Sequence, residues 1–326
     1  MVVYSTMIPD NVLAWLLEPS DPSVRYRTYT ELLGLSAAAP EAVSARTAIP
    51  ASADVRGILD RMNPAGYWLQ RNPRTQAVVG DGSEYGSLAT THFCLSYLAH
   101  LGMDRTDKKV ALAANRYLDL MQPDGDWYKH FSCLYGYNIQ TFILLGYRED
   151  KRLQQTVKLL MDSARADGGY LCDLHEVKKG RRKVKSCIRG SLKSLTAFCE
   201  LGRQYWDHSS CQKLLDYFLD RGGIYSRKDP QLPVNKDVQA MIFPFHWRAG
   251  LVEVLYTLSR MGFGKDPRLD RAWKLLAAKA DRTGRFILEW TPTQSPWKVG
   301  KRGQPNKWMT LYALLAKKAR EGSARN

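Results

Sequence analysis

The chain has 326 residues, of which 44 % are hydrophobic, and its formal net charge is +16. This apolar content is ordinary for a globular protein with a real core, and no run of ~18 apolar residues offers a membrane span. The first ten residues lack a basic region followed by an apolar stretch, so we expect no signal peptide and a cytoplasmic protein. The six cysteines are then expected to be thiols or metal ligands rather than disulfides.

Helical patterns follow one another along the chain, and strand patterns are almost absent. A short helix over 11–17 is stopped by Pro19 and Pro22, a second runs over 24–35, and a connector over 36–52 precedes a helix over 54–62. The later segments are amphipathic helices that come in pairs. They are expected at 91–101, 107–121, 137–145, 150–164, 191–201, 208–219, 247–261, 269–280 and 308–320. The sequence therefore predicts an all-α protein.

The end of the helix over 107–121 recurs in weaker copies. In Asp124-Gly125-Asp126-Trp127, Gly125 supplies a positive φ, and Trp127 can fold back as an apolar plug whose N–H finds a carbonyl. Similar glycine–aromatic endings lie at 63–68, 165–170, 221–225 and 281–286. The first helices of successive pairs stop at Gly102, Gly146, Gly202 and Gly262. An αα-hairpin cannot bury its apolar face alone, so neighbouring hairpins are expected to stack.

The stretch Gln122-x-x-Gly125-x-Trp127, preceded by Tyr117-Leu118, resembles the QW motif of squalene–hopene and oxidosqualene cyclases. The repeat pattern from about 67 to 319 resembles the wider terpenoid cyclase and protein prenyltransferase β-subunit superfamily. The resemblance implies an α/α toroid, a ring of about five to six αα-hairpins with inner and outer helices around an apolar cavity. We expect a helical segment over 1–62 to pack on toroid repeats over 63–326, as one structural domain.

The cyclase branch of this superfamily protonates its substrate with an Asp-x-Asp-Asp motif, which this sequence lacks. Asp124 and Asp126 are the residues that a turn prefers. The prenyltransferase branch holds one zinc ion through an Asp-x-Cys at the start of one inner helix and a His at the start of the next. Cys187 and His246 resemble that Cys and His, but Lys185 stands at the Asp position and cannot ligate while protonated.

Other thiols offer a replacement ligand. The turns that carry Cys133, Cys172 and Cys187 should meet on one rim of the repeats, and thiolate with imidazole suits Zn²⁺. Two residues separate His130 from Cys133, and two separate Cys172 from His175, which is a spacing that metal ligands can have. The candidate metal ligands are therefore Cys133, Cys172, Cys187 and His246. The alternative is that these are small buried thiols that fill the loops, as we expect for Cys94, Cys199 and Cys211.

The remaining rim residues supply candidate catalytic groups. Aromatic residues with a few polar groups suit an apolar ligand, arginines can hold a diphosphate or carboxylate, and histidines can act as general acids or bases. The candidates are His92, Arg189, His246, Arg248, Glu84 and Tyr137. The alternative for each is a helix cap or a satisfied core group.

Two classes of function stay open. The first is a cyclase, lyase, isomerase or transferase that acts on an apolar, isoprenoid or phosphate-bearing small molecule in a central cavity, by acid–base or zinc-assisted chemistry. The second is a non-catalytic binding or scaffold protein whose basic surface contacts an anionic partner, with at most a structural metal. Nucleic acid is less favoured because few aromatics interleave with the basic runs, and peripheral membrane contact is compatible with the charge.

Overall fold

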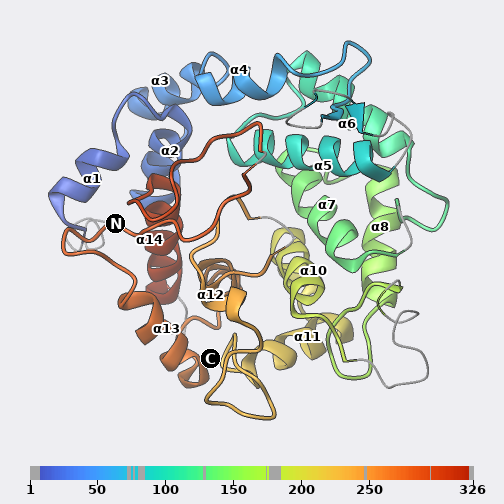
Figure 1. The fold of residues 1–326 in the computed structure, drawn as a ribbon, viewed down its shortest axis with the longest axis vertical. Helices are drawn as coiled ribbons and strands as arrows, with labels where there is room; N and C mark the ends of the chain where they lie inside the picture. Colours follow the sequence, from blue (N-terminus) through green and yellow to red (C-terminus); the bar gives the residue numbers. More distant parts are fainter. Residues whose placement is uncertain are drawn as a thin grey trace. The chain divides into compact units, whose positions relative to one another are not determined.

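The computed structural model describes residues 8–71, 75, 78–79, 85–127, 130–173, 175, 185–245, 248–293 and 295–322. Regular structure within these ranges is helical apart from one antiparallel pair, β1 (Gln70–Arg71) with β2 (Val78–Val79) (Figure 1). No helix in these ranges is both long enough and apolar enough to cross a membrane.

The α-helices are α1 (Asp10–Leu16), α2 (Pro22–Arg27), α3 (Pro40–Ala48), α4 (Ala53–Leu59), α5 (Tyr85–His100), α6 (Lys108–Asp119), α7 (Ser132–Leu144), α8 (Lys151–Asp162), α10 (Ile188–Leu201), α11 (Ser209–Leu219), α12 (Leu251–Arg260), α13 (Asp270–Ala277) and α14 (Lys307–Gly322). A π-helical turn (Thr28–Leu32) continues α2, and the described residues also include short 3₁₀ turns at Arg203–Tyr205, Lys236–Gln239 and Pro267–Leu269.

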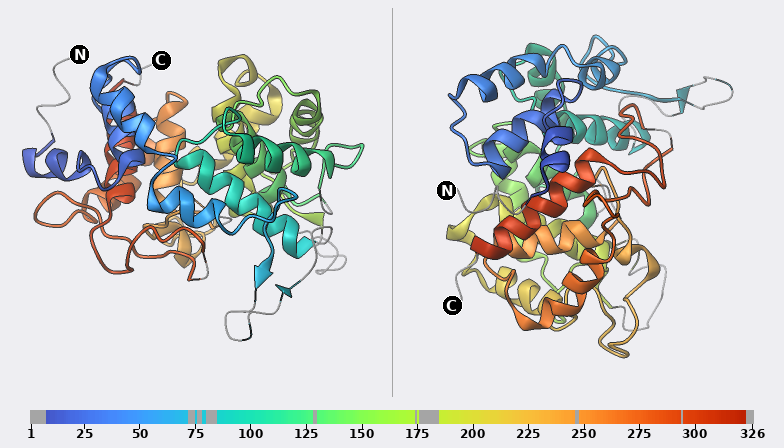
Figure 2. Two further views of the ribbon diagram at one scale, coloured as in Figure 1. Left: turned by 90° about the horizontal axis from the view of Figure 1, so that it is seen from above. Right: turned by 90° about the vertical axis from the view of Figure 1, so that its left-hand side faces the viewer.

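The chain divides into two compact units. Unit 1 contains 1–52, 218–293 and 298–326, and unit 2 contains 53–217 and 294–297. In unit 1, α12 packs along α14 and α2 packs on α3, and Figure 2 shows the orange α12 beside the red α14. In unit 2, α7 packs along α10 and against α5. α6 lies against α5, and α8 lies against α7. Helix pairs therefore build both units.

Glycine allows α7 and α10 to approach closely. A Cβ atom on Gly136 would lie only 2.7 Å from the carbonyl carbon of Lys193, so a larger residue would push the helices apart. A Cβ atom on Gly190 would collide with the hydroxyl of Ser132, which begins α7. The first turns of the two helices therefore lie side by side.

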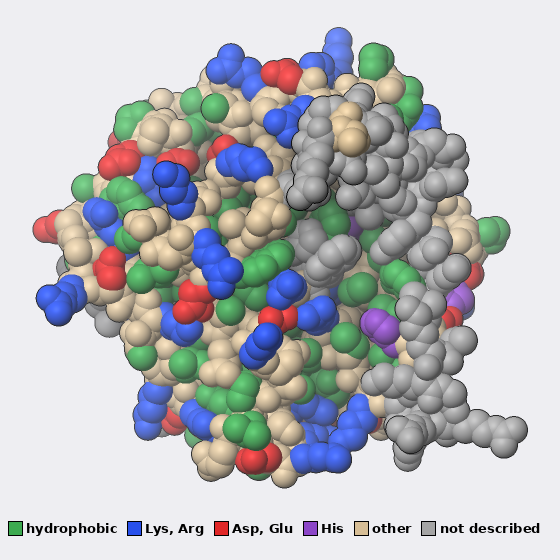
Figure 3. All heavy atoms as spheres, viewed as in Figure 1, with side chains coloured by type: hydrophobic (Ala, Val, Ile, Leu, Met, Phe, Trp, Pro, Cys, Tyr) green, Lys and Arg blue, Asp and Glu red, His purple; other side chains and the backbone are tan. Residues whose placement is uncertain are grey.

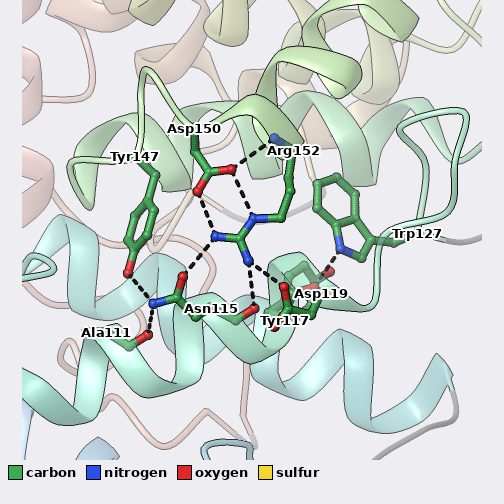
Figure 4. Close-up of polar contacts among 8 residues, drawn as sticks. All are labelled: Ala111, Asn115, Tyr117, Asp119, Trp127, Tyr147, Asp150 and Arg152. Carbon is green, nitrogen blue, oxygen red and sulfur yellow. Dashed lines mark hydrogen bonds and ion pairs between the residues drawn. The ribbon is translucent and has the colours of Figure 1, made fainter.

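Each of the five glycine–aromatic endings contains a glycine with positive φ, as their sequences predict. In three of them a side-chain donor bonds the carbonyl ten residues upstream and fastens the turn to its own helix. The pairs are Trp68 with Ile58 (2.8 Å), Trp127 with Tyr117 (2.9 Å) and Tyr170 with Leu160 (2.8 Å). Figure 4 shows the Trp127 contact beside a second link, in which the guanidinium of Arg152 on α8 bonds the side chain of Asn115 on α6 at 2.8 Å.

The predicted helix stops are confirmed, since Gly102, Gly146, Gly202 and Gly262 have φ angles of 92°, 91°, 94° and 95°. The prediction of a connector over 36–52 was wrong, because α3 occupies Pro40–Ala48 with proline at its start, a position that needs no N–H donor. α5, α7 and α10 begin three or more residues earlier than predicted, and α5 begins at Tyr85. α7 begins at Ser132 and α10 at Ile188, so Cys133 lies inside a first turn.

Candidate functional site

The first group of candidate residues lies on α5, α7 and α10 of unit 2. The ring of His92 lies 4.5 Å from that of Tyr137 and 4.8 Å from that of Phe93, centroid to centroid. Nδ1 of His92 donates to Oδ1 of Asn138, and Nδ2 of Asn138 donates to the hydroxyl of Tyr117 at 3.3 Å. The predicted site residues His92 and Tyr137 are thus in contact. With Phe93 they form a cluster of rings, called the aromatic wall below, and hydrogen bonds link His92 through Asn138 to Tyr117.

A buried lysine adds positive charge to this wall. Lys193 on α10 is fully buried, and its Nζ lies 5.4 Å from the centroid of the Tyr137 ring. Arg189, a predicted site residue, precedes Lys193 by four positions and so shares its face of α10. On α7, Cys133 precedes Tyr137 by the same spacing. Two neighbouring helices therefore carry a thiol–aromatic face and a cationic face.

Burial holds His92 in its neutral form. Burial lowers the pKa of His92, the hydrogen bond to Asn138 opposes this shift, and the charge of Lys193 adds to it, so that the pKa is about 3. The imidazole is therefore uncharged near neutral pH. It can donate a hydrogen bond through Nδ1 but is a weak base.

The buried His92 predicts a specific pH dependence of stability. An unfolded chain protonates this imidazole below pH ~6.5, whereas the folded chain does not, so stability is full above that pH and falls as the pH drops. The expected loss is about 1.4 kcal/mol per pH unit below 6.5. Urea unfolding of the wild type and of His92→Gln at pH 7.5 and 5.0 measures this difference. The variant should lose less stability between the two values.

The exposed His208 provides the control for that comparison. His208→Gln keeps His92 and removes only the contact of His208 with the Ser210 N–H, so the difference in stability between the two pH values should match that of the wild type. Equal losses in the wild type and in His92→Gln would show that His92 does not stay neutral in the folded chain.

The thiols form the second group. Cys133 and Cys187 lie at the starts of α7 and α10, and Cys172 lies in the segment between α8 and α10. The Sγ atoms of Cys133 and Cys172 lie 3.8 Å apart, and the hydroxyl of Ser132 lies 3.5 Å from the Cys172 sulfur. A hydrogen bond from the Cys133 thiol lowers the pKa of Cys172, and the same bond raises the pKa of Cys133. Cys187, the residue before α10, is close enough for its charge to raise the pKa of Cys133 as well.

The predicted thiol cluster is thus brought together in part. Cys133 and Cys172 are in contact and Cys187 is near them, while His246 lies outside the described residues. Within the part of the chain that the structure describes, no three His, Cys, Asp or Glu side chains are already arranged around a metal position.

A histidine between two carboxylates borders the thiols. Nε2 of His130 lies 2.8 Å from Oδ2 of Asp124, and Nδ1 lies 2.9 Å from Oδ2 of Asp173. Hydrogen bonds to Asp124 and then to Asp173 raise the pKa of His130. Two carboxylate acceptors require an N–H on both nitrogens, so the geometry fits the imidazolium form.

Asp126 is the most buried carboxyl group beside these residues. Its Oδ2 accepts a 2.6 Å hydrogen bond from the backbone N–H of His130, and its Oδ1 has no hydrogen-bond partner among the described residues. Burial raises the pKa of Asp126. Asp126 therefore lies in the predicted turn and is also a buried carboxyl group with a raised pKa.

The other predicted catalytic residues are not part of this group. Arg248 belongs to unit 1, where it forms a 2.9 Å ion pair with Asp237 and lies over the ring of Trp290. Glu84 and His246 fall outside the described residues. Their roles stay predictions.

Two features of the site were not foreseen from the sequence. Lys193 is a single charged residue in an otherwise weakly polar stretch of α10, four positions after Arg189, and that spacing was a usable signal. Asp173 had no signal of its own, because its contact with His130 spans 43 positions of the chain.

Comparison with known proteins identifies the fold. No protein-family model and no curated protein matches the sequence. A glycosyl hydrolase family 88 protein from Bacteroides vulgatus matches 95 % of this chain and 97 % of its own, with a TM-score of 0.55 and 14 % identity. A polysaccharide lyase matches 94 % of this chain and 90 % of its own, with a TM-score of 0.52 and 14 % identity. A type II terpene cyclase from Scytonema matches 85 % of this chain and 97 % of its own, with a TM-score of 0.34 and 12 % identity.

The chain has the α/α-toroid fold. The predictions of an all-α protein and of an α/α toroid are confirmed. The similar structures are enzymes by their names, so this is a fold that enzymes use. The fold does not decide the reaction, which depends on the residues of the site.

Proposed function

We propose that the protein is a toroid enzyme that acts on an apolar small molecule bearing an anionic group, such as an isoprenoid diphosphate. The observation that carries this proposal is the pairing of two helix faces in unit 2. α7 presents Cys133 and Tyr137, and the adjacent α10 presents Arg189 and the buried Lys193. Aromatic rings suit an apolar chain, and cations in a desolvated wall suit a phosphate or carboxylate.

Each residue has a definite role in this proposal. Arg189 lies at the start of α10 and Lys193 one turn deeper, so an anion between them would also face the positive end of the helix. Tyr137 and Phe93 would contact the apolar part of the substrate. The neutral His92 would orient it through a hydrogen bond rather than act as a charged acid.

We propose zinc as the cofactor, bound by the cluster of Cys133, Cys172 and Cys187. Two thiolates bound to tetrahedral zinc at ~2.3 Å lie about 3.8 Å apart, and the Sγ atoms of Cys133 and Cys172 are separated by 3.8 Å. Cys187, the residue before α10, would supply a third ligand. His246 is the fourth ligand that the sequence suggests. A bound zinc ion would supply Lewis-acid chemistry or an activated thiolate or water at the edge of the wall.

Ligand binding tests this proposal. Farnesyl diphosphate is expected to bind about 10–100-fold more weakly to Lys193→Met than to the wild type, because a charge-assisted contact is lost. Isothermal titration calorimetry measures both affinities. The control is Lys158→Met, which removes an exposed lysine on α8. Equal affinity in the wild type and Lys193→Met would contradict the proposed role.

The net charge of +16 supports a second candidate, a non-catalytic protein that binds an anionic polymer. On the face drawn in Figure 3, the described Lys and Arg side chains are scattered among acidic and apolar ones. Binding to a phosphate backbone weakens steeply as salt rises. Tight, salt-sensitive binding of duplex DNA with no binding of farnesyl diphosphate would favour this candidate.

A further inference from the structure

His130 links two segments that are far apart in the sequence. Its ring lies between Asp124, in the turn after α6, and Asp173, the residue that follows Cys172. Its backbone N–H donates to Asp126 at 2.6 Å. The side chain and the backbone of His130 therefore hold three carboxylates around one residue, two positions before α7 begins.

The backbone of His130 shows that its position is specified by these contacts. Its φ is 46°, and among the described residues it is the one non-glycine with a positive φ. That conformation is costly for a residue with a Cβ atom and persists when neighbouring contacts fix it. The carboxylate contacts of His130 supply such restraint.

We propose that His130 is a positioning residue that holds Cys172 against Cys133. We call the connection from the start of α7 through the His130 side chain to Asp173 the tether. Asp173 is the next residue in the chain after Cys172. The hydroxyl of Ser132 lies 3.5 Å from the Cys172 sulfur. This inference rests on the proposed function in one respect, because the two thiols matter if they are the metal ligands.

The alternative is that the ion pairs of His130 are surface contacts without consequence. The side chains of His130, Asp124 and Asp173 are 43 %, 48 % and 56 % exposed, and exposed ion pairs usually contribute little to global stability. The test must therefore measure the proximity of the two sulfurs rather than overall stability.

The equilibrium of the thiols with glutathione measures that proximity directly. Reduced Cys133 and Cys172 react with one glutathione disulfide to give a protein disulfide and two glutathione thiols. The equilibrium constant is the effective concentration of one thiol at the other. The experiment uses the metal-free full chain with Cys187→Ser, so that the third thiol of this group cannot compete.

His130→Asn is the principal variant, since asparagine accepts a positive φ and the ring alone is lost. Asp173→Asn removes the negative charge at the other end of the tether and so weakens the contact, without changing the His130 backbone. Each is expected to lower the effective concentration about fivefold, in line with the modest strength of exposed ion pairs. The double variant should have an effective concentration no lower than that of either single variant, because both substitutions act on the same contact between His130 and Asp173.

Asp119→Asn is the matched control, because it removes an exposed ion pair with Arg152 elsewhere in unit 2. It should leave the effective concentration unchanged. If His130→Asn and Asp173→Asn also leave it unchanged, His130 is not a positioning residue. If His130→Asn fails to fold, Asp173→Asn alone decides between these outcomes. No zinc takes part, so a protein without zinc would refute the proposed cofactor and leave this inference standing.

Discussion

Alanine in place of Gly125 is expected to lower the free energy of unfolding by about 3 kcal/mol. Gly125 forms the turn of the QW-like ending with a φ of 90°. A Cβ atom there would lie 2.6 Å from the backbone carbon and oxygen of Gln155 on α8. Backbone atoms of a helix cannot move aside singly, so the turn or α8 must shift.

Gly146→Ala separates the two causes of this loss, which are the positive φ of the glycine and the close contact with α8. Gly146 has nearly the same φ, 91°, but its nearest neighbours are side-chain atoms of Arg105 at 3.5 Å. It should lose only the backbone contribution of about 1–2 kcal/mol. Urea unfolding followed by far-ultraviolet circular dichroism measures both variants, and equal losses would show that the contact with α8 is unimportant.

The repeating turns explain why much of the fold could be predicted from the sequence. A glycine with positive φ and an aromatic residue two positions later are local requirements, so they leave a mark in the chain wherever the turn recurs. Trp127 illustrates this, because its N–H bonds a carbonyl of its own helix. Helix starts were less predictable. α7 begins five residues before Tyr137, since Ser132 and Cys133 gain their environment from α10 rather than from a local pattern.

The site could be predicted where its residues were expected at similar places in successive repeats. His92 and Tyr137 were expected near the starts of successive inner helices, and they are in contact. The restraint of His130 by Asp124 and Asp173 could not be read from the sequence, because it depends on how two loops meet. The same holds for the charge state of His92, which follows from burial and from Lys193.

The loss of a thiol ligand should have the largest effect on function. If Cys133 and Cys172 bind zinc, Cys172→Ser replaces a thiolate by a hydroxyl that does not ionise near neutral pH. Zinc affinity should then fall by more than the ~10–100-fold that follows loss of a residue behind a ligand. Cys211→Ser is the control, because Cys211 is buried in α11 and is not among the proposed ligands. Competition with a chromophoric chelator measures the affinities.

The metal content of the purified, untagged wild-type protein tests the central claim most directly. Elemental analysis is expected to find one zinc ion per chain, with the ion lost in Cys133→Ser and Cys172→Ser and kept in Cys211→Ser. A folded wild-type protein that contains no zinc and does not take it up at micromolar concentration would contradict the proposed metal centre. In that case the chemistry would rest on His92, Arg189 and Lys193 alone.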